Sequence, residues 1–578
     1  MDLKQFLERY GIAVGVVVAL VAVIAILPGN ADDRLTAGNN DFLSAGNGQN
    51  GASGSANGAT GTGTGTSDLG AGSGTGTDGG TGSATGTGGG STAGGGSGGS
   101  SSGGATASGS GFKFGTGPDC DKDGRQKGIT IYMPPCVQWE AGTDNGGSTY
   151  QGVTKDQVKV VRWLGQLDPA TGAILQGAQL SDGRPKIKQT FEAIRRYSNN
   201  HYQTYNREVV FIDMDAGGPS EDDAAMKADA VKIAKEIKPF AVVGGDPSAG
   251  IPNVLARELA QLGVLCICTT SNSSQFYTEL PPLIFGSLPT STEYAANTAE
   301  YVAKKLWNKN AEFAGDEQLP TQTFKKNKRK FGLIYLEGVR GKVDPEGKRA
   351  KDAFDREFAK YGMHFDKESA YIYDPGRNQQ DVTSMIAQMK GAGITTIVSF
   401  WDPLYPILIT KEATRQQYFP EWFITGSGLS DTTAAGRLYD QQQWRHAFGI
   451  SPLWVTWTSV PKSTGYREYK HGDPSGSQGE PGVLVNIYRA GIQTLFRGIH
   501  MAGPDLTNET FVRGELAYPP TGGQPRAPLV FLTREFPTEI KDWVEVWYKS
   551  DEQGPDERDQ PGSGMVMKTS GGKRFKLG

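Results

Sequence analysis

The chain has 578 residues and a formal net charge of −4, with 58 basic and 62 acidic side chains. This length accommodates two domains of ordinary size, and a near-neutral charge without a basic stripe gives no reason to expect a nucleic-acid partner. The 81 glycines are concentrated before residue 112, so we expect the folded region at 112–578.

The N-terminus predicts a membrane anchor. Residues 11–28 contain GIAVGVVVALVAVIAIL, an uncharged run at the lower limit for a membrane span of about 17–25 residues. Lys4 and Arg9 precede this run and acidic residues follow it, which places segment 1–10 in the cytoplasm. A secretory signal peptide cleaved after Ala31 is the alternative. In either case we expect the folded part to be extracytoplasmic. With the anchor retained the chain is a single-pass membrane protein, and with the segment cleaved it is secreted.

Residues 29–111 predict a disordered tether. They consist almost wholly of Gly, Ser, Thr and Ala, as in TGTGTGTSDLGAGSGTGTDGG. Such a segment lacks the apolar side chains that would offset the entropy of an ordered chain. As a random coil it would average roughly 45–55 Å from end to end, which would separate a folded domain from a membrane.

The four cysteines fall into two pairs. Cys120 and Cys136 flank a polar, proline-containing loop, which in an oxidising compartment predicts a local disulfide. Cys266 and Cys268 stand two apart on an expected strand, where regular geometry does not allow a bridge, so we expect small core residues there. No Cys/His spacing resembles a metal site, so no metal is expected.

The first series of expected elements forms a lobe at about 155–307. Short apolar runs rich in β-branched residues predict strands, and apolar side chains at helical spacing predict helices, one of them capped by Ser220. In chain order the expected strands are 158–164, 208–213, 240–243 and 264–268, and the expected helices are 185–197, 220–237, 254–262 and 293–306.

After a basic, polar segment at 308–330 the alternation restarts. Two such series predict two doubly wound, Rossmann-like α/β domains, the second at about 330–450, with a cleft between their strand ends. Later segments are expected to cross between the lobes and to end in helices and a hairpin at about 480–578. The expected strands of the second series are 331–335, 369–373, 395–400 and 422–425, and the expected helices are 346–361, 381–390 and 404–415.

Polar loops follow two neighbouring strands of the first lobe. GGDPSAG at 244–250 follows one strand, and TTSNSS at 269–274 follows the next. Both bring free backbone N–H groups and hydroxyls to the carboxyl edge of the expected sheet, where open α/β sheets bind ligands. In the second lobe, Trp401 and Asp402 follow a strand and either supply an aromatic wall and an acid or pack locally.

The order of these segments resembles the type I periplasmic binding proteins, specifically the branched-chain amino acid (leucine-binding) group of ABC-transporter solute-binding proteins. The matching segments include VKVVRWL, LGVLCICTTSNSSQFYTELPPLIFGSLPTSTEYAANTAEYVAKKL and VNIYRAGIQTLFRGIHMAGPDLT, within about 158–507. The resemblance implies an aromatic residue at 339–345 and an acid for an α-ammonium group at 426–430, but these loops read VRGKVDP and GSGLS. It implies a ligand carboxylate bound by Ser248, Ala249, Thr270, Ser271, Asn272 and Ser273.

The resemblance therefore implies an extracytoplasmic solute-binding receptor. Its lobes would close around a small polar ligand, an amino acid or related carboxylate, for delivery to an ABC-type permease. The predicted anchor and tether leave an alternative, a membrane-tethered sensory or adhesion ectodomain of the same fold without a transport role. The residues argue against an enzyme, because the five histidines are scattered and GGDPSAG lacks the Lys-Ser/Thr of a phosphate-binding loop. No cofactor is expected.

Overall fold

The computed structural model describes residues 113–114, 119–140, 142–167, 169–246, 251–269, 271–315, 324–374, 377–453, 463–523 and 527–575. All of them lie in one compact unit, Ser101–Gly578. The predicted cytoplasmic segment at 1–10, the anchor at 11–28 and the tether at 29–111 lie outside the described residues. Within the described ranges, no helix is long and apolar enough to cross a membrane.

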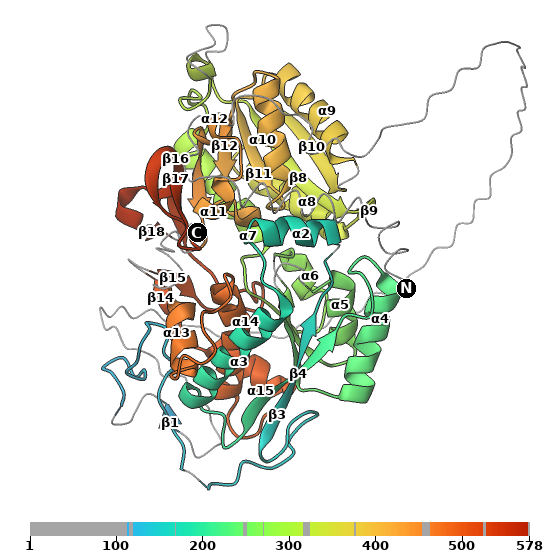
Figure 1. Cartoon of the computed structure of the whole chain (residues 1–578), viewed down its shortest axis with the longest axis vertical. Coiled ribbons are helices and arrows are strands. Elements are labelled where there is room, and N and C mark those ends of the chain that lie inside the picture. The colour runs from blue at the N-terminus through green and yellow to red at the C-terminus, as the bar shows by residue number, and fades with distance from the viewer. Residues whose placement is uncertain are drawn as a thin grey trace, which may run out of the picture. The chain divides into compact units, whose positions relative to one another are not determined.

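The first lobe is built on a five-stranded parallel sheet, drawn in the lower part of Figure 1. Its strand order is β4-β3-β5-β6-β7, so the chain begins inside the sheet, moves to one edge and then continues on the other side, as in doubly wound folds. The strands are β3 (Gln157–Leu164), β4 (Glu208–Asp215), β5 (Ala241–Gly244), β6 (Leu265–Thr269) and β7 (Ile284–Gly286).

Helices cover both faces of this sheet. They are α3 (Arg184–His201), α4 (Asp223–Lys232), which continues as the π-helix η1 (Ile233–Ile237), α5 (Asn253–Gln261), α6 (Ser274–Thr278), α13 (Thr464–Gly472), α14 (Val485–Ala502) and α15 (Asn508–Ala517). Val160 of β3 packs in a core with α3 and α14, whereas Val161 packs in a second core with α4 and α5. Successive residues of β3 are therefore buried on opposite faces, which explains why Val160 and Val161 are both apolar.

The second lobe repeats the strand order of the first. Its parallel strands follow the order β10-β8-β11-β12-β13, and two antiparallel strands, β16 and β17, extend the sheet beyond β13. The strands are β8 (Phe331–Val339), β9 (Lys342–Val343), β10 (Lys367–Tyr373), β11 (Thr396–Phe400), β12 (Glu421–Ile424), β13 (Ala447–Ser451), β16 (Trp543–Pro555), β17 (Pro561–Lys568) and β18 (Arg574–Phe575). Within the range 480–578, β16 and β17 form an antiparallel hairpin, whereas β18 pairs with β16 rather than with β17, so residues 570–572 do not join two paired strands.

The prediction that helix 293–306 belongs to the first lobe is wrong. Tyr294 and Val302 of this helix pack with Phe331 and Leu333 of β8 in the core of the second lobe. Helical periodicity identifies the buried face of a helix but not the sheet that the face covers. The second-lobe helices are α7 (Ser291–Tyr301), which continues as η2 (Val302–Leu306), α8 (Pro345–Ala359), α9 (Asn378–Gly391), α10 (Tyr405–Arg415), α11 (Thr433–Gly436) and α12 (Gln441–Trp444).

Two segments that cross between the lobes lie side by side. The backbone N–H of Gly286, at the end of β7, donates to the carbonyl oxygen of Pro537 at 3.0 Å. The Glu293 carboxylate in α7 accepts from the Thr538 hydroxyl at 3.0 Å and from the Lys541 ammonium group at 2.7 Å. The two crossovers are therefore joined by backbone and side-chain contacts.

Helix α2 (Pro169–Gly177) follows β3 but packs on the second lobe. Its Leu175 lies in an apolar cluster with Leu404 and Ala434, and Figure 1 shows α2 between the two groups of elements. No sequence pattern predicted this helix. The remaining short elements are β1 (Lys113–Phe114), β2 (Val137–Gln138), β14 (Thr521–Gly523), β15 (Ala527–Val530), η3 (Phe324–Lys326), η4 (Ser427–Leu429) and η6 (Ser570–Gly572).

The structure confirms the disulfide between Cys120 and Cys136. Cys266 and Cys268 in β6 are buried in the core of the first lobe, where the sequence predicted small core residues.

Replacing both Cys120 and Cys136 by serine is expected to lower the free energy of unfolding by about 3 kcal/mol, since a loop of this length loses that much constraint in the unfolded chain. Denaturant unfolding of the double variant and the parent chain measures the difference. If dithiothreitol reduces this bond, the free energy of unfolding of the parent chain in dithiothreitol should fall to that of the variant. An unchanged midpoint in the double variant would contradict a stabilising role for the bridge.

Candidate functional site

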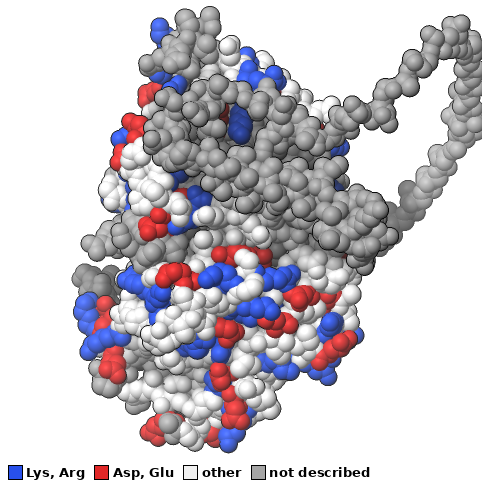
Figure 2. All heavy atoms as spheres, viewed as in Figure 1, with Lys and Arg blue, Asp and Glu red and all other residues white. Residues whose placement is uncertain are grey.

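Acidic and basic side chains are interspersed on the described surface drawn in Figure 2. Many of these charges form exposed pairs within one helix, such as Lys348 and Asp352 of α8 at 2.7 Å. Exposed pairs of this kind contribute little to stability or recognition. The hollows of the surface are therefore the better place to look for a site.

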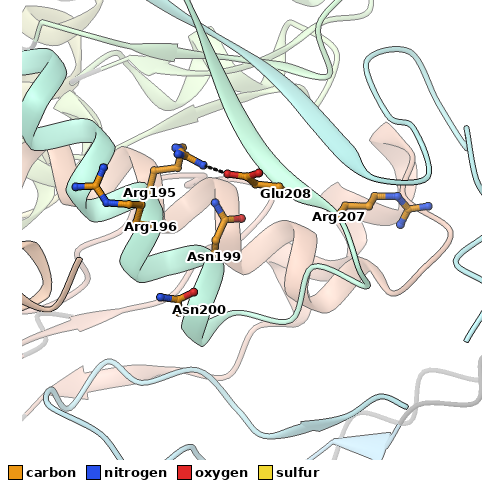
Figure 3. A pocket seen from close by; sticks show the side chains of 6 residues that line it. All are labelled: Arg195, Arg196, Asn199, Asn200, Arg207 and Glu208. Atoms are coloured by element: carbon orange, nitrogen blue, oxygen red, sulfur yellow. Dashed lines mark hydrogen bonds and ion pairs between the residues drawn. The ribbon is translucent and has the colours of Figure 1, made fainter. Parts of the chain in front are cut away.

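A shallow hollow of about 400 Å³ lies between α3 and the start of β4 (Figure 3). The Arg195 side chain, directed toward the strand, donates to the Glu208 carboxylate at 2.6 Å. Arg207 points away from them and donates to backbone carbonyl groups, including that of Thr154 at 2.9 Å. The hollow is at the amino end of β4, on the opposite side from the strand ends that bind ligands in such folds. Its cationic groups are engaged in holding the lobe together, so we assign it no ligand.

A larger cavity of about 860 Å³ lies between the two lobes. Its described walls come from segments that follow β3, β4, β5 and β6 in the first lobe, and from the ends of β8 and β10 and the segments after β8 and β11 in the second. Both sheets thus present their carboxyl ends to the same space, where the sequence predicted a cleft. The lining is a mixture of apolar and charged side chains, with Leu336, Val339, Val343 and Leu404 among the apolar ones.

Six first-lobe residues were predicted to bind the ligand, and three of them can be placed. Ser248, Ala249 and Thr270 lie outside the described residues. The Ser271 hydroxyl donates to the carbonyl oxygen of Pro289 at 3.0 Å, toward a crossover segment.

Asn272 lines the cleft and takes part in a polar chain across it. Its side-chain amide donates to Asn253 Oδ1 at 2.8 Å. The Asn253 amide in turn donates to Asp344 Oδ2, in the second lobe, at 3.0 Å. Asn272 therefore lies at the predicted position, with an amide that is already bound to a neighbour.

Ser273 is bound to the second lobe. Its backbone N–H and its hydroxyl donate to Oε2 of Glu346 at 2.9 and 2.7 Å, respectively. Ser273 is also the N-cap of α6, since its side chain accepts from the N–H of Phe276. The two donors predicted for a ligand carboxylate are thus engaged by a carboxylate of the chain itself.

Trp401 and Asp402, the two predicted second-lobe residues, have different surroundings. Trp401 is buried in an aromatic cluster with Trp422 and Trp444, at centroid distances of 6.1 and 6.3 Å, and is not among the residues that line the cleft. Of the two roles considered from the sequence, aromatic wall of the site or packing residue, Trp401 has the packing role. Asp402 lines the cleft.

The Asp402 carboxylate is held by its own loop. It accepts from the Tyr371 hydroxyl at 2.5 Å and from the backbone N–H groups of Leu404 and Tyr405 at 2.8 and 3.0 Å. Burial raises the pKa of Asp402, and these donors oppose the rise. The residue therefore fixes the start of α10 at the cleft wall.

The acids at the start of α8 were not predicted as site residues from the sequence. Asp344 caps this helix and Pro345 is its first residue, a start signal visible in the sequence. What the sequence does not show is that Asp344 and Glu346 point across the cleft to the first lobe. Loop 339–345 thus supplies acidic and aliphatic side chains where the family resemblance implied an aromatic one.

A second missed acid is Asp431, directly after the loop 426–430 in which an acid was sought. It is buried, and its carboxylate accepts from the Ser451 hydroxyl. Burial raises its pKa to about 7. Its Oδ1 atom has no hydrogen-bond partner among the described residues. Asp431 is not among the residues that line the cleft.

No protein-family model and no curated protein matches the sequence. Among solved structures, the chain is similar to the substrate-binding protein of an ABC transporter from Aeropyrum pernix, with 12% identity, a TM-score of 0.50, and coverage of 73% of this chain and 96% of that chain. A solute-binding protein of Rhodopseudomonas palustris BisB5 in complex with 3,4-dihydroxybenzoic acid has 14% identity, a TM-score of 0.48, and coverage of 73% and 98%. The protein LivJ of Streptococcus pneumoniae in complex with isoleucine has 12% identity, a TM-score of 0.45, and coverage of 72% and 100%. At such identities the likeness concerns the fold: this chain has the two-lobed α/β fold of the type I periplasmic binding proteins of ABC transporters.

Proposed function

We propose that this chain is a solute-binding receptor whose two lobes close around a small ligand and which delivers that ligand to an ABC-type permease. The observation that carries the proposal is the cleft of about 860 Å³ at the carboxyl ends of both sheets. Its volume falls within the roughly 300–1,000 Å³ of small-molecule sites. Closure of two lobes that contact the same ligand is a common way to convert binding into a change of shape.

The composition of the cleft supports a ligand with both apolar and charged parts. Its described lining contains five acidic and three basic side chains beside the aliphatic ones. Arg340 and Arg257 lie 3.3 and 3.8 Å from Glu221 and Glu346, respectively. An excess of acid favours a ligand with a positive group, such as the α-ammonium group of an amino acid. We therefore propose an amino acid, or a related carboxylate that carries an amine, as the ligand class.

We also propose that the folded part is extracytoplasmic and is tethered through the anchor predicted at 11–28. The support is the sequence pattern of an uncharged run with basic residues before it. Intact-mass measurement of the mature protein tests this. A chain that begins at Met1 supports the anchor, whereas a chain that begins at Asp32 means that the segment is a cleaved signal peptide.

A substitution that fills the cleft is expected to abolish ligand binding. Val343 lies at the cleft and is 51% exposed, so Val343→Trp adds volume there without displacing core side chains. Val231→Trp is the matched control, because Val231 on α4 is 44% exposed and is not among the cleft residues. Thermal shift of the full chain is measured against amino acids, amines, aromatic acids and fatty acids.

A ligand at 100 times its Kd should stabilise the parent and the Val231 variant by about 2.7 kcal/mol and leave the Val343 variant unchanged. If no compound raises the melting temperature of the parent, the receptor proposal fails. If Val343→Trp responds as the parent does, the ligand binds elsewhere.

A further inference from the structure

The carboxylate of Glu346 links the second lobe to the first. It belongs to the first turn of α8 in the second lobe, and its side chain is 9% exposed. Oε2 accepts both the N–H and the hydroxyl of Ser273 in the first lobe. Lys342 and Asp223 also pair across this edge, but their side chains are 50% and 48% exposed, so this pair contributes little.

Two guanidinium groups reach the other oxygen of the same carboxylate. Arg349, one turn along α8, lies 2.9 Å from Glu346 Oε1 and 2.7 Å from Glu279 of the first lobe. Arg257 of α5 lies 3.8 Å from Oε1 and stacks over the Phe276 ring at 4.7 Å. Four donor groups from both lobes thus converge on one side chain.

The position of Glu346 is fixed by its neighbour in the chain. A Cβ atom at Gly347 would lie only 2.7 Å from the backbone of Glu337, so α8 approaches β8 more closely than any other residue type would allow. Asp344 caps the helix on the other side of Glu346. The rigid start of α8 therefore holds the carboxylate next to Ser273. Because the carboxylate belongs to the same chain, its effective concentration at Ser273 is higher than that of a free carboxylate in solution.

We propose that Glu346 is a built-in carboxylate that clamps the two lobes together through Ser273, so that the lobes close at this edge without a ligand and a ligand carboxylate is excluded from Ser273. The exclusion rests on the proposed function, whereas the clamp does not. A ligand of the cleft then binds through other groups, and Ser273 is a clamp residue rather than a ligand contact.

Chemical rescue tests the clamp. Glu346→Ala removes a fragment equivalent to acetate and leaves the four donors in place. Glu346→Gln keeps the volume and the acceptor oxygen but not the charge. Asp352→Ala is the control, because Asp352 lies on the same helix and pairs with Lys348 of that helix rather than with the first lobe. Melting temperature and radius of gyration by small-angle scattering are measured for the full chain at constant ionic strength, with sodium acetate exchanged for sodium chloride.

We expect Glu346→Ala to melt at least about 2–4 °C below the parent and to be more extended. Acetate should restore both quantities saturably in this variant, and should have no effect on the Gln variant, the control or the parent. The proposal is overturned if Glu346→Ala keeps the parent values, or if acetate acts equally on all four proteins or on none. These readouts are made without a ligand of the cleft, so a failed ligand screen would not change them, and a successful screen would not replace them.

Discussion

Replacing Arg329 by methionine is expected to lower the free energy of unfolding by about 3–5 kcal/mol, the usual cost of stranding a buried charge. Arg329 donates to both oxygens of Glu421 at 2.7 and 2.8 Å, and both side chains are almost fully buried. Glu421 opens β12 and also accepts from the Thr396 hydroxyl and the Phe313 amide. Methionine fills much of the space of arginine but leaves the carboxylate without its counter-charge.

Urea unfolding of the parent, Arg329→Met and the double variant Arg329→Met/Glu421→Met measures this loss. The double variant should recover most of it, because the stranded charge is then removed as well. Lys330→Met is the control, since the adjacent Lys330 is exposed and its change should stay within about 0.5 kcal/mol. A single variant as stable as the parent would show that the ion pair contributes nothing net.

Replacing Asp431 by asparagine is expected to raise stability at pH 8 by roughly 2–4 kcal/mol. Burial raises the pKa of Asp431 from its usual 3.8 to about 7 in the folded protein. The folded state therefore binds the proton more tightly than the unfolded state, so the stabilising effect of protonation is complete below pH 4 and is lost as the pH rises through 7. Each tenfold change in proton affinity corresponds to about 1.4 kcal/mol.

The difference in unfolding free energy between Asp431→Asn and the parent should thus be small at pH 4, grow up to pH 7 and level off above it. Denaturant midpoints at half-unit steps of pH measure the curve. Asp559→Asn, at an exposed position, is the control and should stay within about 0.5 kcal/mol throughout. A variant that is less stable than the parent at pH 8 would mean that the ionised carboxylate is stabilised by its surroundings.

Much of the fold follows from local patterns in the sequence. β5 was predicted because a strand buried on both faces needs an unbroken apolar run, and β3 because apolar residues predominate in it despite Lys159 and Arg162; both patterns are visible without any knowledge of their neighbours. Helix α2 was missed because PATGAILQG has no helical stripe: Leu175 is buried against the second lobe while Ile174 is 43% exposed. β13 was missed because AFGIS is short and has a glycine at its centre.

The candidate site was less accessible from the sequence, because its contacts join distant segments. The loop containing Asn272 and Ser273 was predicted from strand-end geometry, and the structure places Asn272 at the cleft. The partner of Ser273 lies 73 residues further along the chain, in the other lobe. Nothing in the residue type of Glu346 distinguishes it from any other acid in the first turn of a helix. Such a pairing depends on how the lobes meet, which periodicity and composition do not encode.

The paired crossover segments at Gly286 and Pro537 also limit how one lobe can move relative to the other. A single connection lets two bodies swivel about the axis of the chain, since rotation about a few backbone bonds meets little resistance. The chain also crosses between β13 and α13, and the two crossings joined by the backbone hydrogen bond and by the Glu293–Lys541 ion pair further resist twisting of one lobe against the other. The lobes are therefore expected to open and close mainly by hinge bending, with little rotation of one lobe about the long axis of the other.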